Sequence, residues 1–117
     1  MTPLPLPTTM VLAHHHTMPE RIEKLCTAIE NEHNCNAKHV GCVFVTVMDG
    51  LLKVWEGSLE VFLLEGHREA TICYAWREFD GHEVKYVMVL EIPPVNSPES
   101  AVRAAIARAA KDERRQA

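Results

Sequence analysis

The 117-residue sequence lacks any apolar run near the ~20 residues that a transmembrane helix needs. It also lacks a strong charge of either sign, because the formal net charge is only −4. A slightly acidic chain is not typical of proteins that mainly bind phosphate backbones, so nucleic acid is not expected as a partner. No basic segment follows Met1, and Pro3, Pro5 and Pro7 interrupt the apolar stretch that a secretory signal requires. We therefore expect a cytoplasmic protein with no membrane contact.

Recognisable catalytic motifs are missing as well. The sequence contains no G-x-S-x-G, no H-E-x-x-H and no glycine-rich phosphate loop. Two loop histidines, His67 and His82, are expected at opposite ends of a sheet, where neither can assist the other. We predict no catalytic residues, and the sequence favours a protein that is not an enzyme.

Cysteine is present but does not form a disulfide pattern. A chain of this length buries about two thirds of its unfolded surface and needs no covalent support. Reduced thiols in a bacterial cytosol are therefore the expectation. The four cysteines are Cys26, Cys35, Cys42 and Cys73.

The densest group of metal-capable residues is His33, Cys35, His39 and Cys42, four candidates within ten positions. Zinc accepts such ligands, which makes zinc the one cofactor to consider. The spacing shows neither C-x-x-C nor a helical histidine pair, however. The alternative is a helix end with a solvated histidine and small buried thiols, and then no cofactor is predicted.

Residues 1–16 read as a flexible tail that contains alternating prolines and three consecutive histidines, and 17–117 as one domain. Thr17 with Glu20 forms a capping box that predicts a helix at about 18–33. Ser97 followed by Pro98 predicts the start of a final helix. Between the helices, four runs of apolar and β-branched residues predict strands at Val40–Met48, Lys53–Leu64, Ala70–Phe79 and Glu83–Ile92.

Two Asp-Gly pairs, Asp49-Gly50 and Asp80-Gly81, separate strands and predict β-hairpins. A 1-2-3-4 order is then the simplest connection. The expected fold is α+β, a four-stranded antiparallel meander with the N- and C-terminal helices packed on one face, in the order α-β-β-β-β-α. Gly57 within the second strand indicates a bulge or a close backbone approach.

The first strand would be an edge of this meander, yet it has no charge, no proline and apolar residues on both faces. Such an edge aggregates unless something covers it or the strand order differs. We expect a symmetric homodimer, and the function predicted is a non-catalytic binding or adaptor module. The predicted interface consists of Cys42, Phe44, Val45, Thr46 and Val47.

A second hypothesis is a small-molecule-binding protein or small enzyme with a pocket between the helices and the sheet. Trp55, His67, Tyr74 and Trp76 would line that pocket. Aromatic residues on a sheet face are more often part of a core.

Several short runs carry a resemblance to a known group of proteins. They are Val54-Trp55-Glu56-Gly57, Gly66-His67, Tyr74-Ala75-Trp76, the run from Pro93 to Pro98, and the run from Ala101 to Ile106. The segment from Val54 to Ile106 resembles small uncharacterised bacterial proteins carried on mobile gene cassettes of the integron type. The resemblance implies a cytoplasmic accessory protein, often oligomeric, with no assigned activity, and it transfers no catalytic residue.

Overall fold

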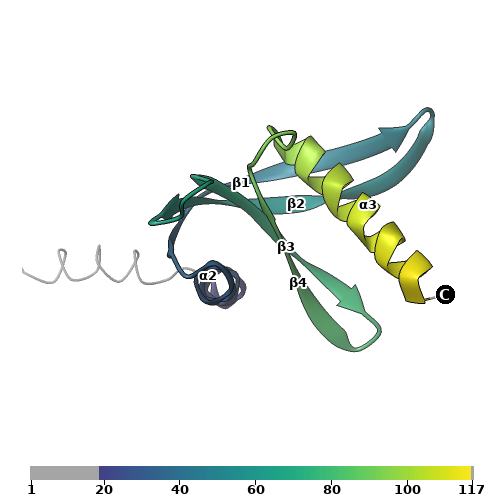
Figure 1. Cartoon of the computed structure of the whole chain (residues 1–117). Helices are drawn as coiled ribbons and strands as arrows, with labels where there is room; N and C mark the ends of the chain where they lie inside the picture. Colours follow the sequence, from purple (N-terminus) through teal and green to yellow (C-terminus); the bar gives the residue numbers. More distant parts are fainter. Residues whose placement is uncertain (1–18, 117) are drawn as a thin grey trace, which may run out of the picture.

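The computed structural model describes residues 19–116, so the expected tail and the capping residue Thr17 lie outside the described part. Elements follow the order expected from the sequence (Figure 1). They are α2 (Glu20–His33), β1 (Asn36–Asp49), β2 (Leu52–Glu65), β3 (Ile72–Asp80), β4 (Glu83–Leu90) and α3 (Pro98–Gln116).

The four strands form one antiparallel sheet in the order β1-β2-β3-β4, which confirms the meander and the α+β class. Both hairpins turn at the expected glycines, since Gly50 and Gly81 have φ values of 66° and 67°. A glycine accepts this left-handed conformation without a Cβ clash. The two hairpins splay apart at their tips, as expected for a strongly twisted sheet (Figure 1).

Helix α2 ends at His33, and a turn at Asn34 and Cys35 follows it. Asn34 adopts the left-handed conformation, with φ 53°, and its amide donates to the carbonyl of Glu30 at 2.9 Å. The chain then enters β1 at Asn36, four residues earlier than the sequence predicts for this strand. Ser97 caps α3 as predicted, because its Oγ accepts the Ser100 amide at 3.1 Å.

The helices cover opposite faces of the sheet, not the single face that we expected. Alternate residues of β3 show this directly. Cys73 and Ala75 pack with α2, whereas Tyr74 and Trp76 pack with α3. The central strands carry apolar residues on both faces, which requires a layer on each side.

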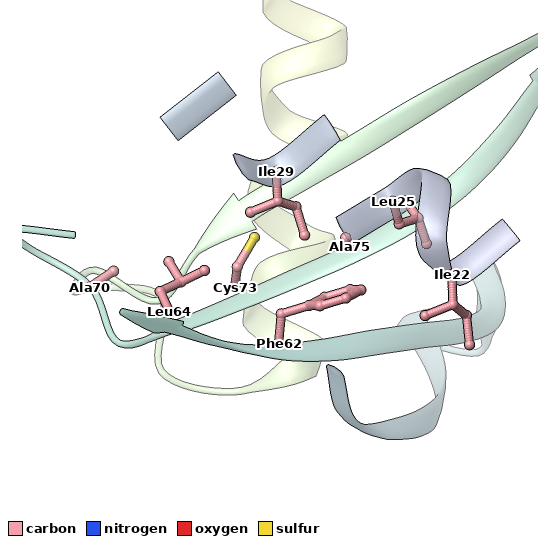
Figure 2. Packing of buried hydrophobic residues seen from close by; sticks show 8 residues of the cluster. All are labelled: Ile22, Leu25, Ile29, Phe62, Leu64, Ala70, Cys73 and Ala75. Atoms are coloured by element: carbon pink, nitrogen blue, oxygen red, sulfur yellow. The ribbon is translucent and has the colours of Figure 1, made fainter. Parts of the chain in front are cut away.

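Each face therefore has its own small core. Under α2, the helix stripe Ile22, Leu25 and Ile29 meets Phe62 and Cys73 (Figure 2). Under α3, the core consists of Val45, Val47, Leu59, Tyr74, Trp76, Val89, Ala101 and Val102. A register shift between His39 and Gly41 lets the two ends of β1 serve different cores, with Ala37 packing under α2 and Val45 under α3.

Candidate functional site

A groove of about 820 Å³ lies between α3 and the β4 side of the sheet. Helix α3 is buried near its start, at Ala101 and Val102, whereas Ile106 and Ala109 further along are exposed. The C-terminal part of α3 extends away from the strands (Figure 1). Val87 and Val89 of β4 face it from the sheet. The groove continues around the edge of β4 to Glu32 and His33 of α2.

Two indole rings line the groove. Trp55 and Trp76 meet edge to face, with ring centroids 5.6 Å apart. A Cβ on Gly57 would come within 3.0 Å of the Trp55 ring, so the indole lies against bare backbone there. This close approach is one of the two roles predicted for Gly57.

The polar groups of the groove lie on both walls. On the sheet, Glu78 accepts a hydrogen bond from the Trp76 indole N–H at 3.0 Å and pairs in register with Lys85. On the helix, Arg108 and Asp112 line the groove one turn apart. Charges of both signs therefore flank an apolar floor.

The four predicted pocket residues do not form one site. Trp55 and Trp76 line the groove, and Tyr74 is buried in the core on the same face. Burial, followed by the hydrogen bond and the charge of Glu91, raises the pKa of Tyr74 to about 12. His67 lies elsewhere, in a smaller hollow beside His33, where the two ring centroids are 5.7 Å apart.

His67 shapes its own loop. Its Nδ1 accepts the amides of Glu69 and Ala70, both at 3.1 Å. In the neutral ring this arrangement places the proton on Nε2. The histidine therefore acts as a cap for the turn between β2 and β3.

The predicted zinc ligands are separated rather than gathered. His33 faces His67, while His39 Nε2 lies 2.7 Å from Glu60 Oε1. Within residues 19–116, no group of three or more potential ligands is placed to hold a metal ion. Zinc binding stays a prediction from the sequence alone.

The Glu60–His39 pair is not among the site residues predicted from the sequence. Glu60 is only 5% exposed and lies on the same face as Phe62, against which the His39 ring also packs. Side chains alternate between the two faces of a strand, so Glu60, two residues before the buried Phe62, is expected to point inward with it. In the described residues every buried side-chain polar atom has a partner, so this pair is satisfied within the α2-side core.

The free thiols are not activated as nucleophiles. Burial, as the largest cause, raises the pKa of all four, and it raises the pKa of Cys73 to about 12. The nearby carboxylates of Glu60 and Glu30 raise the pKa values of Cys42 and Cys35 further. A thiol needs a lowered pKa to attack at neutral pH, and these have the reverse.

The five predicted interface residues of β1 alternate between two environments. Val45 and Val47 are buried under α3 of their own chain, so they are unavailable to another molecule. Phe44 is 64% exposed, and Cys42 and Thr46 are exposed with it on the other face. Strand pleating separates the two sets.

No family model, no curated protein and no solved structure matches the chain. Among the described residues, no helix combines the length and the apolar character needed to cross a membrane.

Proposed function

We propose that this chain is a non-catalytic binding module that acts as a homodimer, with α3 of a second copy held in the groove between α3 and β4. One observation carries the proposal. The C-terminal half of α3 presents Ile106 and Ala109 to the groove, and no described part of the chain covers them. An apolar stripe of this kind is normally buried against another element.

Charge complementarity favours a second copy as the occupant. A two-fold axis at Ala110 places two α3 helices antiparallel and sets Arg108 of each opposite Asp112 of the other. Ala105 and Ala109 lack bulk on the same side, so the helix axes can approach closely. An isologous contact of this kind closes on itself and gives a dimer, not a filament.

The chemistry of the other candidate sites supports a non-catalytic role. Every thiol has a raised pKa. The ring nitrogens His67 Nδ1 and His39 Nε2 are already engaged in hydrogen bonds within the chain. The resemblance to cassette-borne bacterial proteins, which are often oligomeric and cytoplasmic, agrees with this proposal.

A matched pair of substitutions on α3 tests the dimer. Ala109→Glu places a charge on the groove side of the helix, and Ala107→Glu places the same charge on an exposed position that does not line the groove. Glu is a good helix former, so both variants should fold. An unpaired charge in a desolvated contact costs about 2–5 kcal/mol, so Ala109→Glu should weaken the dimer roughly 30-fold or more.

Light scattering over a dilution series is the measurement. Wild type and Ala107→Glu should be dimeric at concentrations where Ala109→Glu is monomeric. A wild-type chain that stays monomeric at high concentration contradicts the homodimer. Equal behaviour of the two variants places the contact somewhere other than this groove.

Reversing charges tests the antiparallel arrangement. Arg108→Asp alone should weaken association, because it sets two acidic groups against each other in each of the two contacts. Arg108→Asp combined with Asp112→Arg should restore it. Failure of the double variant to recover would exclude the two-fold axis at Ala110.

The Trp55–Trp76 pair favours one second candidate function, the binding of a flat apolar small molecule in the same groove. These are the only two tryptophans of the chain, so intrinsic fluorescence reports directly on the groove. Saturable quenching by an aromatic ligand that persists in the Ala109→Glu monomer would support this function. Wild-type emission that shifts only on dilution would support the dimer.

A further inference from the structure

The groove contains the outer edge of β4. This strand is last in the order β1-β2-β3-β4, so one side of its backbone has no strand beside it among the described residues. Every residue from Lys85 to Leu90 lines the groove, although alternate residues of a strand point to opposite faces. Val87 packs on the α3 side and Met88 on the α2 side. The groove therefore follows the strand edge itself, with residues of α3 on one side and of α2 on the other.

Alternate backbone groups of β4 are directed toward this edge. The Glu91 amide donates to the Ile72 carbonyl of β3 at 2.9 Å. In an antiparallel ladder every second residue pairs with the same neighbour, so the odd-numbered residues of β4 face β3 and the even-numbered ones face outward. The Leu90 carbonyl accepts the Ile92 amide at 2.9 Å and keeps one lone pair. The outward positions are Val84, Tyr86, Met88 and Leu90.

We propose that β4 pairs antiparallel with β4 of a second copy about a two-fold axis at Met88, which joins the two four-stranded sheets into one. The pairing rests on the homodimer proposed above, because a symmetric dimer has a single axis. That axis passes Ala110 in the contact between the α3 helices, and Met88 and Ala110 both line the groove. The two α3 helices then meet above the joined strands.

Charge complementarity favours this register. Lys85 and Glu91 are equally far along the chain from Met88, so each lysine lies opposite the glutamate of the other copy. Lys85 makes none of the ion pairs among the side chains that the structure describes. The Tyr74 hydroxyl donates to Oε2 of Glu91 at 2.5 Å, which leaves the second carboxylate oxygen for the lysine. Opposite charges directly across two strands stabilise a sheet.

Apolar side chains match in the same register. Val87 of each copy meets Val89 of the other on the α3 side of the joined sheet. An axis moved by one residue, to Val87, would instead set Glu83 opposite Glu91 of the other copy. Like charges in that position destabilise a sheet. The charges and the apolar residues of β4 therefore agree on one axis.

A disulfide across the axis tests the register. Residues opposite each other in a hydrogen-bonded antiparallel pair have Cα atoms about 5.5 Å apart, which a disulfide spans. Met88→Cys, combined with Cys42→Ala to remove the exposed native thiol, should therefore link two copies on mild oxidation. Val84→Cys in the same background is the control. Val84 is 44% exposed, but in this register it lies about 27 Å from Val84 of the other copy.

Non-reducing electrophoresis, followed by mass spectrometry of the linked peptides, measures both variants. Met88→Cys should link at least about tenfold more than Val84→Cys, because only its sulfur atoms come within bonding distance. Random collisions would favour the more exposed Val84→Cys. Equal linking of the two variants, or more linking of Val84→Cys, overturns the proposal.

Amide hydrogen exchange read by NMR separates the β4 pairing from the α3 contact. The Met88 amide should exchange at least about tenfold more slowly in the wild-type dimer than in Ala109→Glu. If Ala109→Glu dissociates the dimer but the Met88 amide exchanges at the same rate in both proteins, the β4 pairing is overturned and the α3 contact stands. If Ala109→Glu keeps both the dimer and the slow exchange, the α3 contact fails and the β4 pairing stands. A monomeric wild type overturns both.

Discussion

Phe62→Ala should lower the free energy of unfolding by about 3–5 kcal/mol, the cost typical of emptying a large buried aromatic site. Phe62 is 0% exposed and is the largest fully buried side chain on either face of the sheet. It lies under α2 beside Ile22 and Leu25, in a core of few large residues (Figure 2). Collapse around the cavity is limited, because the strand backbones on either side are hydrogen-bonded in the sheet.

Phe79→Ala is the matched control, since Phe79 is 71% exposed at the β3–β4 turn. The Arg77 guanidinium lies over the Phe79 ring, 5.7 Å from the ring centroid. Loss of such an exposed cation–π contact costs about 1 kcal/mol or less. Urea unfolding followed by far-UV circular dichroism measures both variants. Equal losses for the two phenylalanines would contradict the assignment of the core to the α2 side.

Alkaline pH should destabilise the protein once it rises above about pH 9. The pKa of Cys73 is raised from 9.0 to about 12 by burial, and that of Tyr74 from 10.0 to about 12. Between the unfolded and folded pKa values the unfolded chain has released these protons and the folded chain has kept them. Stability is therefore complete below about pH 9 and falls as pH rises toward 12.

The magnitude follows from 1.36 kcal/mol per pH unit for each group. By pH 11, Cys73 alone should lower the free energy of unfolding by about 2–3 kcal/mol. Cys73→Ala should remove the contribution of Cys73 to the pH dependence of the free energy of unfolding and leave the contribution of Tyr74. Cys42→Ala, at an exposed thiol, should leave most of the slope intact. Urea unfolding from pH 8 to 11 is the measurement, and a wild-type midpoint unchanged across that range would refute the prediction.

Local chemistry was enough to predict the elements and their order. Gly50 and Gly81 sit where a left-handed residue is needed, and both hairpins turn there. Ser97 Oγ accepts the Ser100 amide in the first turn of α3, and Gly57 leaves room for the Trp55 ring. Each of these signals acts over a few residues, so the sequence carries it without knowledge of the fold.

The candidate site was less accessible to such reasoning. Trp55 and Trp76 were expected together and do line one groove, but His67 lies beside His33 instead. The four candidate metal ligands are close in sequence, yet the extended β1 carries them apart. Glu60 contacts His39, which comes from another strand, so the pattern of either strand alone does not predict the pair.

The sequence by itself determined one α+β meander with two helices, because hairpin turns, helix caps and strand periodicity are short-range effects. Only the tertiary structure decided that the helices lie on opposite faces. Both faces of β2, β3 and β4 are apolar, so periodicity cannot say which set of side chains meets which helix. The same arrangement buries Val45 and Val47, leaves Phe44 exposed, and forms the groove beside the exposed C-terminal part of α3.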